Sequence, residues 1–163
     1  MINVLHVSKI ESVPEENIVR NGGFETGALY PWRLKGSGAV EHRPIVHQMS
    51  GNYSFAFTTP AKDVTYLSQT LPLVKAGLYE VQGYLRRRGG TSKEMVFVAS
   101  FYPSSMSLTG TTISTKFYTK FTMRVLSVAS GRRMLTLGIY NNSAINAAHI
   151  DLDNVSMKKL EVD

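Results

Sequence analysis

The feature that most constrains the fold is a succession of short segments rich in β-forming residues, each separated from the next by turn residues. Apolar residues at helical spacing are nearly absent. The predicted strands cover residues 2–7, 39–45, 53–58, 65–71, 78–85, 95–102, 111–115, 120–128, 134–140 and 149–160. About ten short strands at this spacing predict an all-β fold, a sandwich of two antiparallel sheets.

The length of 163 residues fits one domain, and no linker or internal repeat divides the sequence. We therefore predict a single domain over residues 1–163, with residues 1–16 as an N-terminal extension that carries the strand at 2–7. No apolar run is long enough for a membrane-spanning helix. The absence of cysteine excludes disulfides and thiolate metal sites.

The charge balance is basic, with 18 Lys and Arg against 12 Asp and Glu, a net charge of +6. Such a balance favours anionic partners, although scattered charge can also serve solubility alone. The tightest basic cluster is 86–88, and lysines occupy 158–159. We do not expect nucleic acid as a partner, because no aromatic residues are interleaved with these arginines.

No catalytic motif is present: the sequence lacks a GxSxG elbow, an HExxH zinc motif and a phosphate-binding GxxxxGK loop. The four histidines share no metal-ligand spacing. We therefore predict a protein that is not an enzyme, with no catalytic residues.

Alternation along a strand assigns its two faces. In the segment 78–86, it predicts that Tyr79, Val81 and Leu85 lie in the core. The opposite face then carries hydrogen-bonding groups around one aromatic ring: Glu80, Gln82, Tyr84 and Arg86. In the segment 134–140, the same argument turns Tyr140 outward.

Three motifs stand apart from the strand pattern. The first, at 17–27, contains Asn-Gly-Gly-Phe-Glu and is followed by Trp32; its glycines allow a tight turn that Phe24 and Trp32 can pin to the core. The second is Ser-Gly-Asn-Tyr-Ser at 50–54, and the third is Ile-Asp-Leu-Asp-Asn-Val-Ser at 150–156. In this order the motifs resemble carbohydrate-binding-module jelly rolls of the galactose-binding-like superfamily, over residues 17–159.

The resemblance implies a structural calcium ion. In many such modules a glutamate and a late aspartate meet at Ca²⁺, which here would be Glu25 and Asp153, joined by backbone carbonyls of the 50–52 turn. The alternative is that Glu25 caps backbone amides while Asp153 pairs with a lysine or arginine. Both interpretations stay open at this stage.

The resemblance also implies a glycan site on a concave sheet face, where sugars pack on aromatic rings and polar groups hold their hydroxyls. The predicted ligand-binding residues are Glu80, Gln82, Tyr84, Arg86 and Tyr140, with Tyr102 nearby. The alternative is a solvated polar face. Trp32 is expected in the core and not at the site.

Similar jelly rolls, as the resemblance implies, occur on the spore surface and exosporium of bacilli. The sequence shows no secretion signal and no linker to a hydrolase, unlike glycan modules that accompany enzymes. Our first expectation is therefore a structural protein that self-assembles into a homo-oligomer or lattice at a spore surface or in a spore-associated crystalline body, with the strand at 2–7 pairing across a sheet edge. The alternative function is a carbohydrate-binding module.

Overall fold

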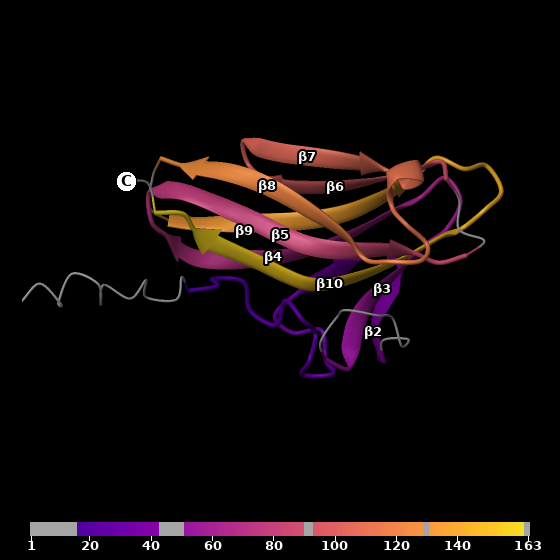
Figure 1. Cartoon of the computed structure of the whole chain (residues 1–163), viewed down its shortest axis with the longest axis horizontal. Helices are drawn as coiled ribbons and strands as arrows, with labels where there is room; N and C mark the ends of the chain where they lie inside the picture. The colour runs from indigo at the N-terminus through magenta and orange to yellow at the C-terminus, as the bar shows by residue number, and fades with distance from the viewer. Residues whose placement is uncertain (1–15, 43–50, 90–92, 129–130, 162–163) are drawn as a thin grey trace, which may run out of the picture.

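The computed structural model describes residues 16–42, 51–89, 93–128 and 131–161. These residues form two five-stranded sheets packed face to face, with β5, β8 and β10 in front of β4, β6 and β9 in Figure 1. The predicted all-β, two-sheet antiparallel sandwich is therefore confirmed. The strand predicted at residues 2–7 lies outside the described residues.

We call the two layers sheet A and sheet B. Sheet A has the order β1 (Arg33–Lys35), β4 (Val64–Val74), β9 (Gly131–Asn141), β6 (Met95–Phe101) and β7 (Ser104–Thr109). Sheet B has the order β2 (Gly38–His42), β3 (Tyr53–Thr59), β10 (Ala148–Lys159), β5 (Gly77–Arg87) and β8 (Thr119–Ser127). All neighbouring strands in both sheets are antiparallel.

The region after β6 differs from the prediction. The strand expected at 111–115 is wrong, because Gly110–Thr112 forms a 3-10 helix, η2. The Thr112 hydroxyl donates to the carbonyl of Thr109 at 2.7 Å, a local hydrogen bond that favours a turn. The strand lies earlier instead, at Ser104–Thr109, where alternating serines hide the β pattern.

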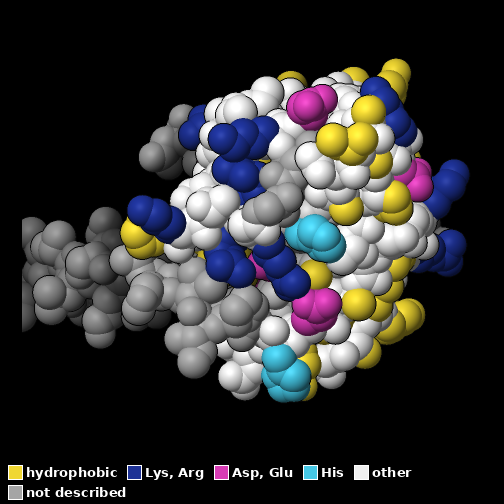
Figure 2. Space-filling view, turned by 90° about the vertical axis from the view of Figure 1, so that its right-hand side faces the viewer, with side chains coloured by type: hydrophobic (Ala, Val, Ile, Leu, Met, Phe, Trp, Pro, Cys, Tyr) yellow, Lys and Arg dark blue, Asp and Glu magenta, His cyan; other side chains and the backbone are white. Residues whose placement is uncertain are grey.

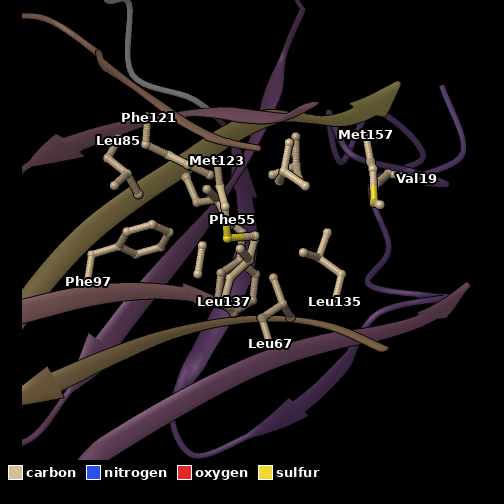
Figure 3. Close-up of a cluster of buried hydrophobic side chains, with 14 of the residues drawn as sticks. Val19, Phe55, Leu67, Leu85, Phe97, Phe121, Met123, Leu135, Leu137 and Met157 are labelled. Carbon is tan, nitrogen blue, oxygen red and sulfur yellow. The ribbon is translucent and has the colours of Figure 1, made fainter. Parts of the chain in front are cut away.

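The core lies between the sheets and draws on both. Tyr79, Val81 and Leu85 of β5 are all buried, as their alternation predicts. Figure 3 shows Phe55 from β3 lying over Leu137 from β9, with further side chains of both sheets around them. Burial of these large apolar side chains provides the main favourable term for packing the two sheets.

The segment before β1 is fixed to the sandwich by the motif at 17–27. Phe24 and Trp32 are buried, and their rings stack with centroids 6.0 Å apart. The Gly22 carbonyl accepts the backbone N–H of Val155 at 2.9 Å. A Cβ atom on Gly22 would lie 1.9 Å from the carbonyl oxygen of Val155, so glycine alone allows this approach to β10.

Candidate functional site

The structure places the predicted ligand-binding residues on two different faces. Glu80, Gln82, Tyr84 and Arg86 lie together on β5, on the outer face of sheet B. Tyr140 lies on β9, on the outer face of sheet A. Tyr140 is thus separated from the other four residues by the thickness of the sandwich. The sequence grouped all five because alternation distinguishes inward from outward residues but does not show which sheet a strand joins.

The outer face of sheet B contains a network of ion pairs. Asp151 on β10 is fully buried and accepts hydrogen bonds from Nη2 of Arg86 at 3.0 Å and Nη2 of Arg88 at 2.7 Å. Arg88 also pairs with Glu41 of β2 at 2.7 Å. The hydrogen bond to Asp151 raises the pKa of Arg88 further above its usual range. Figure 2, which shows one end of the molecule, has several Lys and Arg side chains close together, with Asp or Glu side chains next to some of them.

Other polar groups of this face are also engaged within the protein. Gln82 donates to Glu80, and the Arg124 guanidinium lies 3.6 Å from the same carboxylate. Tyr118, from the loop before β8, is close enough to Asp151 and Asp153 that their charges act on its phenol. Burial is the main cause that raises the pKa of Tyr118 to about 12, followed by these two carboxylates. The face predicted around Tyr84 therefore has few polar groups left to bind a ligand.

The outer face of sheet A has a different arrangement, built around two tyrosines. Tyr66 of β4 pairs in register with Gly138 of β9, and Tyr140 follows two residues later. A Cβ atom on Gly138 would lie 2.8 Å from Cδ1 of Tyr66, so the Tyr66 ring lies against the backbone of β9. The two hydroxyls are 2.6 Å apart, and the rings meet edge to face at 5.6 Å. We call Tyr66, Gly138 and Tyr140 the tyrosine platform.

On this face Val96 and Val98 of β6 pair in register with Tyr140 and Gly138, and small hydroxyl side chains occupy many of the other outward positions. They are Ser68, Thr70, Ser100, Ser105, Ser107, Thr109 and Thr136. At the far end of the face lie Met134, which is 55% exposed, and Tyr102, which is 84% exposed. Both are two residues beyond the register pair Ser100 and Thr136, Met134 on β9 and Tyr102 in the turn between β6 and β7. The face thus offers an aromatic surface at each end and hydroxyls between them.

Sequence reasoning missed Tyr66, although two signals pointed to it. Tyr66 is next to the buried Leu67 in β4, so alternation predicts that its side chain points outward. The same argument turned Tyr140 outward in β9. Gly138 interrupts the mostly apolar stretch 134–140, and such a glycine often marks a close approach by another group. The register between β4 and β9 could not be read from either segment alone.

The two predicted calcium ligands have different surroundings. Glu25 is exposed and accepts the backbone N–H of Asn52 at 2.9 Å and that of Tyr53 at 3.1 Å. Asp153 is fully buried, and its Oδ1 accepts the N–H of Asn154 at 2.8 Å. These contacts match the alternative role of Glu25 as a cap for backbone amides.

Calcium usually takes six to eight oxygen ligands. In the described part of the chain, no three His, Asp or Glu side chains are placed to hold a metal ion. Two carboxylates alone do not supply a calcium site, so calcium binding stays a prediction from the resemblance.

Solved structures with this fold include several carbohydrate-binding modules. TmCBM61 in complex with β-1,4-galactotriose superposes with a TM-score of 0.73 at 21% identity, over 89% of this chain and 99% of that chain. The CBM22-1 xylan-binding domain of Paenibacillus barcinonensis Xyn10C gives a TM-score of 0.61 at 15% identity, over 91% and 97% of the two chains. At these identities the likeness establishes the jelly-roll fold.

Part of an enzyme also shares the fold. The arabinose-bound α-L-arabinofuranosidase MgGH51 gives a TM-score of 0.67 at 15% identity, but this chain covers 26% of that one. No protein-family model and no curated protein matches the sequence. Within the described residues, no helix has the length and apolar character needed to span a membrane.

Proposed function

We propose that this protein is a non-catalytic carbohydrate-binding module that holds a glycan on the outer face of sheet A. The observation that carries the proposal is the tyrosine platform, in which Gly138 lets the half-buried Tyr66 ring lie against the sheet. The C–H faces of sugar rings pack on such aromatic surfaces, and neighbouring hydroxyl groups bind the sugar hydroxyls. The named ligands of the solved jelly rolls, a galactotriose and xylan, support a glycan as the ligand class.

Sheet A is favoured over sheet B because of how their polar groups are engaged. On sheet B, Arg86 and Arg88 are neutralised by Asp151, so a sugar would have to break ion pairs to reach them. On sheet A, Thr70, Ser105 and Ser107 are exposed, and no ion pair between described residues has to be broken to reach them. The Thr109 hydroxyl bonds to the hydroxyl of the neighbouring Thr111. The residues predicted around Tyr84 therefore serve as the comparison in the test.

The ligand is an oligosaccharide or polysaccharide segment and not a single sugar. Tyr140 and Met134 are six residues apart on one strand, which corresponds to about 20 Å along the sheet. Tyr102, in the turn after β6, is at the same end of the sheet as Met134, because Ser100 pairs with Thr136. A ligand that contacts both aromatic ends must have several sugar units.

The test compares aromatic residues on the two faces. A glycan array identifies a ligand, and calorimetric titration then measures its affinity for the wild type, Tyr66→Ala and the matched control Tyr84→Ala. We expect Tyr66→Ala to weaken binding at least tenfold, about 1.4 kcal/mol, and Tyr84→Ala to leave it unchanged. Gly138→Ala, which displaces the Tyr66 ring without removing it, should also weaken binding.

Thermal unfolding of each variant tests whether the fold is retained. Binding that is lost in Tyr84→Ala and retained in Tyr66→Ala would move the site to sheet B. An array without any bound glycan would overturn the proposal.

Self-assembly at a spore surface, our first expectation from the sequence, stays a prediction. The strand at 2–7 on which it depends lies outside the described residues, and the solved structures above give it no support. The carbohydrate-binding function has the stronger support from the fold and from the tyrosine platform.

A further inference from the structure

Two basic side chains border the tyrosine platform. Arg33 and Lys35 are exposed residues of the edge strand β1, and they pair in register with Ser68 and Tyr66. Leu34, between them, packs against the core, so both basic side chains are on the outer side of sheet A. Side chains in register on adjacent strands have Cβ atoms about 5 Å apart, so Lys35 is the β1 neighbour of Tyr66, on the side opposite to Gly138.

The two basic side chains of β1 have no acidic partner among the described residues, unlike the arginines of sheet B. The described outward positions of the strands of sheet A hold no acidic side chain. Two acidic residues flank these strands: Asp63, just before β4, accepts the N–H of Val64 at 2.7 Å, and the exposed Glu94 lies just before β6. Sheet B instead pairs Arg86, Arg88 and Arg124 with carboxylates.

We infer that the glycan is anionic and carries carboxylates, as in a uronate-containing polysaccharide. This inference rests on the proposed function and specifies its ligand class. The Arg33 guanidinium can take a carboxylate through two parallel N–H donors, and Lys35 acts as a point charge next to the stacked sugar. The two residues are roughly 7 Å apart along β1, so they can meet acidic groups on a chain that runs over the sheet.

The experiment separates the carboxylate from the rest of the sugar. Oligosaccharides of galacturonate, of mannuronate and of glucuronate-substituted xylan are each titrated beside their carboxyl-reduced, neutral forms. We expect at least one uronate to bind tenfold or more tightly than its reduced form, with an affinity that falls as salt is raised. Arg33→Gln/Lys35→Gln should abolish this difference and leave the affinity for the reduced form within twofold.

A matched control removes two positive charges elsewhere. Lys158→Gln/Lys159→Gln alters two exposed lysines on β10 of sheet B and should keep the preference for the uronate. An equal loss in this control would show a net-charge effect and overturn the inference. Reduced forms that bind as tightly as every uronate, through Tyr66, would also overturn it and leave the proposed function standing. Failure of every glycan to bind would overturn both.

Discussion

The pKa of the Tyr118 phenol depends on the buried carboxylates near it. Burial and the carboxylates of Asp151 and Asp153 raise its pKa to about 12, against 10.0 for an ordinary tyrosine. The unfolded chain therefore loses this proton at a lower pH than the folded protein. The stability contributed by neutral Tyr118 is complete below pH 10 and is lost as pH rises toward 12.

We predict that Tyr118→Phe flattens this part of the pH profile. Between pH 9 and pH 12, the free energy of unfolding should fall less in the variant than in the wild type, because phenylalanine has no proton to lose. Urea denaturation at each pH gives the measurement. Parallel profiles for the two proteins would contradict the assigned cause.

A Glu25→Gln variant can distinguish calcium binding from the capping of backbone amides. If the resemblance holds for calcium, Ca²⁺ raises the thermal midpoint of the chelator-treated wild type and leaves that of Glu25→Gln unchanged. If Glu25 only accepts hydrogen bonds from the amides of Asn52 and Tyr53, Glu25→Gln lowers the free energy of unfolding by about 1 kcal/mol, equally with Ca²⁺ and with chelator. Calorimetric melting under both conditions decides between the two, and an unchanged wild-type midpoint rejects calcium.

Among the elements, β10 connects the charge network of sheet B. Its Asp151 accepts from Arg86 on β5 and from Arg88 just after it, and Arg88 continues to Glu41 on β2. Asp151→Ala would leave two arginines without their buried partner and should cost about 3 kcal/mol. Glu41→Ala, at a side chain 42% exposed, should cost less than about 1 kcal/mol. If chemical denaturation gave the same decrease in the free energy of unfolding for both variants, a central role for Asp151 would be contradicted.

The same elements show what the sequence could and could not predict. Alternation identified the buried face of β5, because each of its inward residues meets a core between two sheets. It missed β1, which has three residues, and β7, whose serines replace outward β-formers. It also turned Tyr140 outward correctly but grouped it with Tyr84. Which sheet a strand joins depends on pairing between residues far apart in the sequence, and no local pattern contains that information.

At the scale of the whole molecule, the self-assembly prediction concerns open sheet edges. Within the described residues, β1 and β7 border sheet A, and β2 and β8 border sheet B. If residues 2–7 pair across one of these edges, light scattering should show oligomers that become monomers when residues 1–8 are deleted. A monomeric full-length chain, or unchanged oligomers after the deletion, would contradict that prediction.

The position of β10 also bears on how the protein is made in the cell. Of the described strands it is translated last, yet it lies between β3 and β5 in the middle of sheet B. While the nascent chain still lacks residues 148–159, β3 and β5 have unpaired inner edges and cannot complete their layer. Formation of sheet B therefore waits until translation of this region is finished, and a stop codon before residue 148 would remove the centre of the layer and not its margin.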